Sequence, residues 1–158
     1  MALAGVAMLL LTACSNIDCP VQNTVSTVYN LYTTDEQVDT LRDTLYVLTR
    51  RANGSDTLLL NAAIGVTHFQ LPISYTNPED TLFFLCVNRP DFMALDTVFL
   101  KKENIPHFES VDCSASFFHR LTNVRSTNNA IEYIKITKDF VDYDDKTAHF
   151  HIGFKARP

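Results

Sequence analysis

Residues 45–60 read LYVLTRRANGSDTLLL, so two apolar runs flank a polar stretch that contains Asn53-Gly54. Asn-Gly is the strongest short signal for a tight hairpin, because both residues readily adopt the positive φ angles that such a turn requires. The valine, threonine and tyrosine of the first run favour an extended, half-buried chain. The segment therefore predicts a β-hairpin that joins a strand at Leu45 to Thr49 with a strand at Leu58 to Leu60.

Similar short runs recur along the chain, whereas a helical period is almost absent. Alternating or β-branched stretches predict further strands at residues 25–32, 66–71, 81–87, 97–101, 130–137 and 147–154. The exception is residues 115–122, where Phe117, Phe118 and Leu121 stand at helical offsets and predict one short helical turn. About seven or eight strands at this spacing predict an all-β fold, an antiparallel β-sandwich of the immunoglobulin-like kind, with a small barrel as the alternative.

The N-terminal segment predicts where the protein is sent. Residues 3–13 read LAGVAMLLLTA, an uncharged apolar run that is typical of a secretory signal and too short to span a membrane. It closes with Leu11-Thr12-Ala13-Cys14, which resembles the lipobox of bacterial lipoproteins. The resemblance implies that the chain is cut before Cys14 and that this cysteine carries lipid. The alternative is an apolar N-terminal strand with a buried thiol, which has no need of small residues before the cysteine.

This interpretation divides the chain into three parts. Residues 1–13 are a lipoprotein signal peptide, residues 14–23 a short lipidated tether, and residues 24–158 a single β-sandwich domain. The formal net charge is −5 and no run of Lys or Arg occurs, which makes nucleic acid an unsuitable partner. The predicted partner is a membrane, held through the N-terminal lipid.

The other three cysteines are Cys19, Cys86 and Cys113, so at most one pair can form within the chain. Cys86 lies in the apolar run LFFLCV at residues 82–87 and is expected to be a small buried hydrophobe. Cys19 and Cys113 lie in polar, turn-like surroundings and are predicted to form a disulfide, with two free thiols as the alternative. No Cys-x-x-Cys pair is present, which argues against a metal site built from cysteines.

Five tripeptides of the form Asp-Thr-aliphatic begin at residues 39, 43, 56, 80 and 96. One interpretation is the start of a strand, with Asp closing a turn and Thr beginning a half-buried run. The other is that the tripeptide resembles the O-glycosylation signal of exported Bacteroidetes proteins, which makes each threonine a candidate glycan acceptor. The candidates are Thr40, Thr44, Thr57, Thr81 and Thr97, of which the first two adjoin a polar stretch and are expected to be the most exposed.

His149-Phe150-His151 is the best candidate for a metal site, because residues two apart on a strand share a face. Three preceding acids offer oxygen ligands: Asp142, Asp144 and Asp145. The favoured interpretation is a plain strand in which the apolar residues point inward and both histidines point outward. The inward residues are Phe150, Ile152 and Phe154. The sequence therefore predicts no metal and no cofactor.

Catalytic signatures are missing from the sequence. Neither Gly-x-Ser-x-Gly nor His-Glu-x-x-His occurs, and a thiol and base made from Cys113 with His107 or His119 has no support beyond proximity along the chain. We therefore expect no enzyme.

Tyrosines offer a platform for sugar binding, although tyrosine more often fills the margin of a small core with its hydroxyl outward. The tyrosines concerned are Tyr29, Tyr32 and Tyr46.

The lipobox, the Asp-Thr-aliphatic set and the stretches CPVQNTV at 19–25 and PHFESVDC at 106–113 resemble an uncharacterised family of Bacteroidales lipoproteins. The resemblance implies a Bacteroides-type envelope and no known activity. The expected function is that of a membrane-anchored envelope lipoprotein with a structural or interaction role. The alternative is an accessory binding protein for a glycan or a small apolar ligand. The expected location is the outer membrane, and a single acid after Cys14, Asp18, favours its periplasmic face over the cell surface.

Overall fold

The structure is a computed structural model that describes residues 24–51, 53–88, 92–110 and 112–156. The predicted hairpin is present: β2 (Thr44–Arg50) pairs antiparallel with β3 (Asp56–Ala63), and Gly54 in the turn has a φ of 81°. The all-β prediction is also confirmed, because the described residues form ten strands and no helix. Within those ranges, nothing has the helical length and apolarity that a membrane crossing requires.

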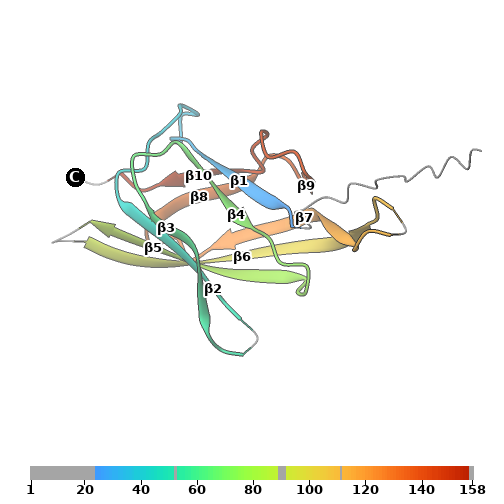
Figure 1. Ribbon diagram of the computed structural model, residues 1–158. Coiled ribbons are helices and arrows are strands. Elements are labelled where there is room, and N and C mark those ends of the chain that lie inside the picture. Colours follow the sequence, from blue (N-terminus) through green and yellow to red (C-terminus); the bar gives the residue numbers. More distant parts are fainter. Residues whose placement is uncertain (1–23, 52, 89–91, 111, 157–158) are drawn as a thin grey trace, which may run out of the picture.

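Two sheets pack face to face, as predicted for a sandwich. The smaller sheet has the strand order β4-β1-β10-β8, and the larger sheet has the order β3-β2-β5-β6-β7-β9. Figure 1 shows the larger sheet curling beneath the smaller one. The remaining strands are β1 (Ser26–Leu31), β4 (His68–Pro72), β5 (Glu79–Asn88), β6 (Phe92–His107), β7 (Ser116–Ser126), β8 (Ile131–Ile136), β9 (Phe140–Val141) and β10 (Phe150–Phe154). The pairing is antiparallel except between β1 and β10, which run parallel.

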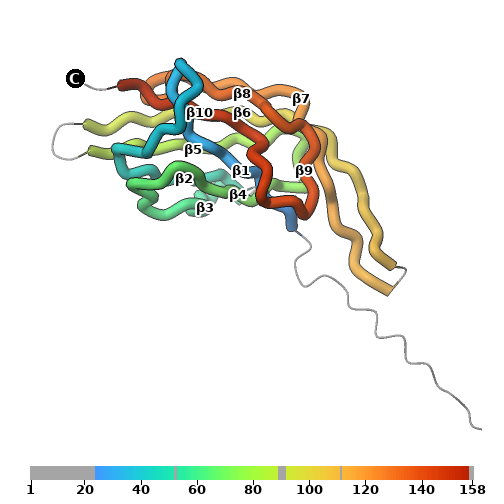
Figure 2. Tube along the Cα trace, turned by 90° about the horizontal axis from the view of Figure 1, so that it is seen from above, coloured from blue at the N-terminus to red at the C-terminus, as the bar shows by residue number. Residues whose placement is uncertain are grey.

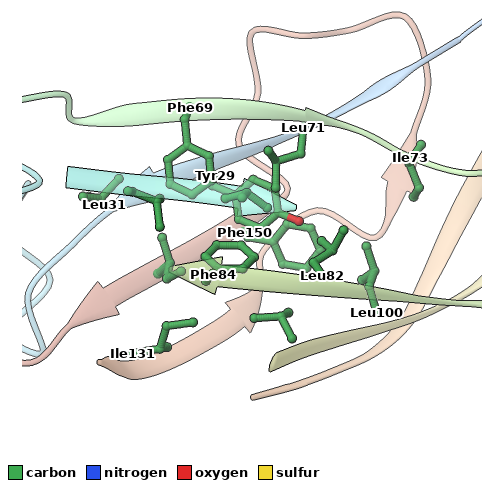
Figure 3. Packing of buried hydrophobic residues seen from close by; sticks show 14 of the residues in the cluster. Tyr29, Leu31, Phe69, Leu71, Ile73, Leu82, Phe84, Leu100, Ile131 and Phe150 are labelled. Atoms are coloured by element: carbon green, nitrogen blue, oxygen red, sulfur yellow. The ribbon is translucent and has the colours of Figure 1, made fainter. Parts of the chain in front are cut away.

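The core lies between the sheets and is centred on stacked aromatic rings. The ring of Tyr29 on β1 lies 4.9 Å from that of Phe69 and 4.6 Å from that of Phe150, while Phe84 meets it edge-on from the opposite sheet (Figure 3). Tyr29 is fully buried, and burial raises the pKa of its hydroxyl above the usual range. The expectation that Tyr29 lies at the core margin with its hydroxyl outward is therefore wrong.

Residues 115–122 do not form the predicted helical turn. They belong mainly to β7, which pairs with β6 from His107 opposite Ser116 to Val98 opposite Ser126. Local helical offsets are a weak preference, and pairing with a neighbouring strand overrides them. β6 is also longer than predicted, at 16 residues, because its first part pairs with β5 and its second part with β7.

The strand directions give the sandwich two distinct ends. β1 starts at the N-terminal end, where the described chain begins at Thr24, and runs towards the C-terminal end, where Lys155 follows β10 (Figures 1 and 2). The N-terminal end carries the loop between β4 and β5, the tip of the β6–β7 hairpin and the loop before β10. The C-terminal end carries the connection from β1 to β2 and the start of β8.

Candidate functional site

A pocket of about 340 Å³ opens at the C-terminal end of the sandwich. Its lining combines apolar and polar side chains, which is the usual composition of a small-ligand site. Leu31, Leu41, Phe154 and Ala156 supply the apolar side chains. The polar lining residues are Thr33, Thr34, Asp39, Thr40, Arg42, Asp43, Asn88, Glu132 and Lys155.

The connection between β1 and β2 forms one wall of the pocket and is fixed by backbone hydrogen bonds. The Asp39 amide donates to the Leu31 carbonyl at 3.0 Å, which folds the connection back on β1. Leu41 donates to the carbonyl of Val66 and accepts from the amide of Gly65, both at 2.9 Å. Gly65 has a φ of 69°, which few other residues adopt without strain. The wall is therefore a braced turn.

Charged groups of both signs surround the pocket. Asp39 Oδ1 accepts from the Thr40 amide at 2.8 Å and lies 3.6 Å from the guanidinium of Arg42. The Arg42 side chain is 74% exposed, so this ion pair adds little stability and leaves donors available at the mouth. Asp43 is buried, and its Oδ1 accepts from Nδ2 of Asn88 at 3.0 Å. This arrangement suits a neutral ligand with hydroxyl groups and one apolar face.

The sequence model of a family of unknown function, DUF6452, matches residues 44–154. The chain belongs to the DUF6452 family. The matched residues run from the start of β2 to the end of β10, so they include both sheets. β1 precedes the matched region, although it lies between β4 and β10 in the smaller sheet. Comparisons of the chain with curated proteins and with solved structures give no significant match.

In this DUF6452 member, three of the Asp-Thr-aliphatic tripeptides share an arrangement. Their aspartates and aliphatic residues are buried, while the threonines between them are half-buried. The tripeptides begin at Asp43, Asp80 and Asp96. The interpretation that Asp only closes a turn missed this burial, because an aspartate in a sequence usually indicates exposure.

Asp96 shows what such a buried aspartate does in the DUF6452 fold. Its carboxylate accepts hydrogen bonds from the Thr127 hydroxyl at 2.7 Å and from the amides of Asn129, Ala130 and Ile131 at 2.5, 2.7 and 2.7 Å. Burial opposes ionisation, but these donors outweigh it and lower the pKa of Asp96. The side chain therefore holds the turn between β7 and β8.

The five candidate glycan acceptors differ in exposure. Thr40 is exposed, and the other four are half-buried: Thr44, Thr57, Thr81 and Thr97. Thr40 thus meets the expectation of exposure, whereas Thr44 does so only in part because it begins β2. Thr40 also lines the pocket. Glycosylation itself stays a prediction.

The predicted orientation of the two C-terminal histidines is wrong for His149. It is fully buried, its Nδ1 accepts from the Val28 amide at 3.1 Å, and its own amide donates to the Val28 carbonyl at 2.9 Å. His149 precedes β10, so strand alternation does not apply to it. His151 is half-buried, and its ring lies 4.1 Å from that of Tyr32. The inward placement of Phe150 and Ile152 is confirmed.

No metal site emerges from the part of the chain that the structure describes. These residues contain no group of three or more His, Cys, Asp or Glu arranged to hold an ion. Asp142 and Asp144 instead pair with Lys138, at 3.5 and 3.1 Å. Burial, with the nearby charge of Lys138, lowers the pKa of His149, which disfavours the protonated form of this histidine.

The two histidines that the sequence offers as bases for Cys113 contact other side chains in the described structure. His119 Nδ1 lies 2.8 Å from Oδ1 of Asn104, and His107 Nε2 lies 2.8 Å from Glu109. Cys86 is buried, as predicted, and it is not part of a disulfide. Cys113 has an interaction partner. Cys14 and Cys19 lie outside the described residues, so the lipid and the Cys19–Cys113 disulfide stay predictions.

Proposed function

We propose that this DUF6452 chain is a lipid-anchored, non-catalytic interaction module of the bacterial envelope, of the Bacteroidales type. The lipobox Leu11-Thr12-Ala13-Cys14 supports the anchor, with residues 14–23 as the tether and residues 24–158 as the domain. The proposed place is the periplasmic face of the outer membrane. The proposed partners are envelope proteins or glycans.

One relationship carries the interaction role: the elements that line the pocket and the start of the domain lie at opposite ends of the sandwich. Figure 1 shows these two ends of β1 and β10. β1 runs from one end to the other over six residues, which corresponds to about 20 Å at roughly 3.3 Å per residue. A lipid at Cys14 holds the N-terminal end near the membrane, so the pocket at the other end faces away from the lipid. Such a domain presents its pocket to partners in the surrounding compartment.

The anchor is tested by growing a Bacteroides host on an alkyne-labelled fatty acid and comparing the wild-type chain with C14A. The wild type is expected to take up the label and to sediment with membranes, and C14A is expected to do neither. The control is C86A, because Cys86 is buried inside the domain and is not expected to take up lipid. A C14A variant that stays labelled and membrane-bound contradicts the proposal.

A second candidate function is the binding of a neutral oligosaccharide in the pocket. The pocket lining offers the hydroxyls of three threonines and the amide of Asn88, together with apolar side chains for the face of a sugar ring. Three carboxylates and two basic side chains also line the pocket, so charges of opposite sign nearly balance and give little preference for a charged ligand. The many polar groups in the lining make a purely apolar ligand the weaker choice.

Thermal shift measurements with a panel of oligosaccharides test this second candidate. A ligand that binds only the folded state raises the melting temperature with its concentration. R42A is expected to reduce this rise, because Arg42 lines the pocket and is exposed enough to leave the fold intact. The matched control is R51A, an exposed arginine in the turn between β2 and β3. An equal rise in both variants contradicts binding in the pocket.

A further inference from the structure

Exposed aromatic side chains gather at the N-terminal end of the domain. Among the described residues, the large aromatics with high exposure are Phe108 at 66%, Tyr75 at 55% and Tyr143 at 42%. They come from three separate segments: the tip of the β6–β7 hairpin, the loop between β4 and β5, and the loop before β10. The C-terminal end also exposes large apolar side chains, but these are not aromatic, such as those of Val38 and Met93.

The β6–β7 hairpin carries Phe108 on a braced support. Figure 2 shows this hairpin projecting beyond the other strands at the N-terminal end. The Phe118 ring on β7 stacks on His107 of β6 at 4.1 Å and meets the ring of Tyr143 at 5.1 Å. Tyr75 stacks on Phe117 of β7 at 5.2 Å. These contacts link both strands to neighbouring loops, so they brace the last paired residues of the hairpin, next to Phe108.

The length of the tether limits how far this end can lie from the membrane. Residues 14–23 separate the proposed lipid site from Thr24, and about ten extended residues span at most ~35 Å. Aromatic side chains are suited to the membrane–water interface, where their apolar rings contact the lipid. The hydroxyl of tyrosine can stay hydrated there. We infer that the N-terminal end is a membrane-contact surface, with Phe108 inserted at headgroup level and Tyr75 and Tyr143 beside it. This inference rests on the proposed lipid anchor.

The charge at the tip identifies the kind of lipid surface. Phe108 is followed by Glu109, and Asp112 lies in the same turn, so the tip is acidic. Acidic groups gain nothing from the negative surface potential of anionic lipids. The surface it fits is therefore a zwitterionic interface, and the contact is driven by apolar burial, which salt does not screen.

The chain contains no tryptophan, so one introduced tryptophan reports on its own surroundings. F108W and the control M93W are prepared as lipidated full chains in phosphatidylcholine vesicles whose acyl chains carry bromine. Met93 is 74% exposed, similar to Phe108, and lies at the C-terminal end. The tryptophan emission of F108W is expected to shift to the blue and to lose roughly half its intensity. The emission of M93W is expected to stay unchanged, and high salt is expected to change neither result.

Flotation of the same vesicles separates this inference from the proposed anchor. Protein that floats with the vesicles, while F108W is quenched no more than M93W, overturns the membrane-contact surface and leaves the anchor intact. Quenching of F108W that disappears in high salt also overturns it, because the contact is then electrostatic. Lipid-labelled protein that fails to float overturns the anchor, and the inference with it.

Discussion

The carboxylate of Asp80 lies 2.8 Å from the ammonium group of Lys102 between the two sheets, where both side chains are almost completely shielded from solvent. Lys102 also donates to the carbonyl of Asn77 at 2.8 Å, and the amide of Ser74 donates to Asp80 at 3.2 Å. The pair thus joins β5 and β6 to the loop between β4 and β5. Because that loop carries Tyr75, the buried pair supports the N-terminal end.

Removing one partner of this pair is expected to be costly. K102M leaves the Asp80 carboxylate buried without its counter-charge, and breaking a buried ion pair in this way costs about 3 to 5 kcal/mol. Urea denaturation measures the free energy of unfolding. The double variant D80N/K102M is expected to recover part of the loss, because it leaves no buried charge. A K102M variant as stable as the wild type would show that the pair is solvated.

Asp96 is expected to matter through its charge as well as its shape. D96N keeps a carbonyl acceptor but loses the charge that its four donors share, and we expect a loss of about 2 to 3 kcal/mol. The matched control is D56N, because Asp56 forms an exposed pair with Arg50 at 3.0 Å. Such pairs contribute about 1 kcal/mol or less. Equal losses of stability in D96N and D56N would contradict the role assigned to Asp96.

The buried side chain of His119 predicts that the free energy of unfolding decreases in acid. Burial, with the nearby charge of Lys102, lowers the pKa of His119 to about 4, while a histidine in the unfolded chain titrates near its ordinary value of 6.5. Between these values the unfolded chain binds more protons, so stability is complete above pH ~6.5 and falls as the pH drops towards ~4. The fall attributable to His119 is at most on the order of 3 kcal/mol.

Urea denaturation at pH 7 and pH 4.5 measures this loss. Because carboxylates also titrate in acid, the informative quantity is the difference between variants. H119Q removes the titrating group and is expected to lose less stability on acidification than the wild type does. H68Q, at an exposed histidine in β4, is expected to behave like the wild type. An H119Q variant that loses as much stability between pH 7 and pH 4.5 as the wild type does would contradict this role of His119.

Local features of this fold could be predicted from the sequence, and features that depend on distant segments could not. The Asn53-Gly54 hairpin was predictable because its turn chemistry is local. The burial of His149 was not, because its partner Val28 lies 121 residues away in the chain. The pocket escaped prediction for the same reason: the structure brings its lining together from the β1–β2 connection, Asn88, Glu132 and the residues after β10.

Thr40 is the acceptor on which the glycosylation prediction now depends most. It is exposed, whereas the threonines of the other four tripeptides are half-buried. In protein made by a Bacteroides host, T40A is expected to lose more attached glycan mass than T81A, because Thr81 lies in the middle strands of the larger sheet. Glycopeptide mass spectrometry checks this. If peptides that contain Thr40 carry no modification, the glycosylation interpretation is contradicted. The tripeptides are then explained by their position at the start of strands alone.

The central claim is that Cys14 becomes the lipidated first residue of the mature protein. Intact-mass measurement of wild-type protein purified from the membranes of a Bacteroides host tests it directly. We expect a chain that begins at Cys14, lacks residues 1–13 and carries the added mass of acyl chains, with any glycan appearing as further separate increments. A mature chain that retains residues 1–13, or one that begins at Cys14 without acyl mass, would contradict the account.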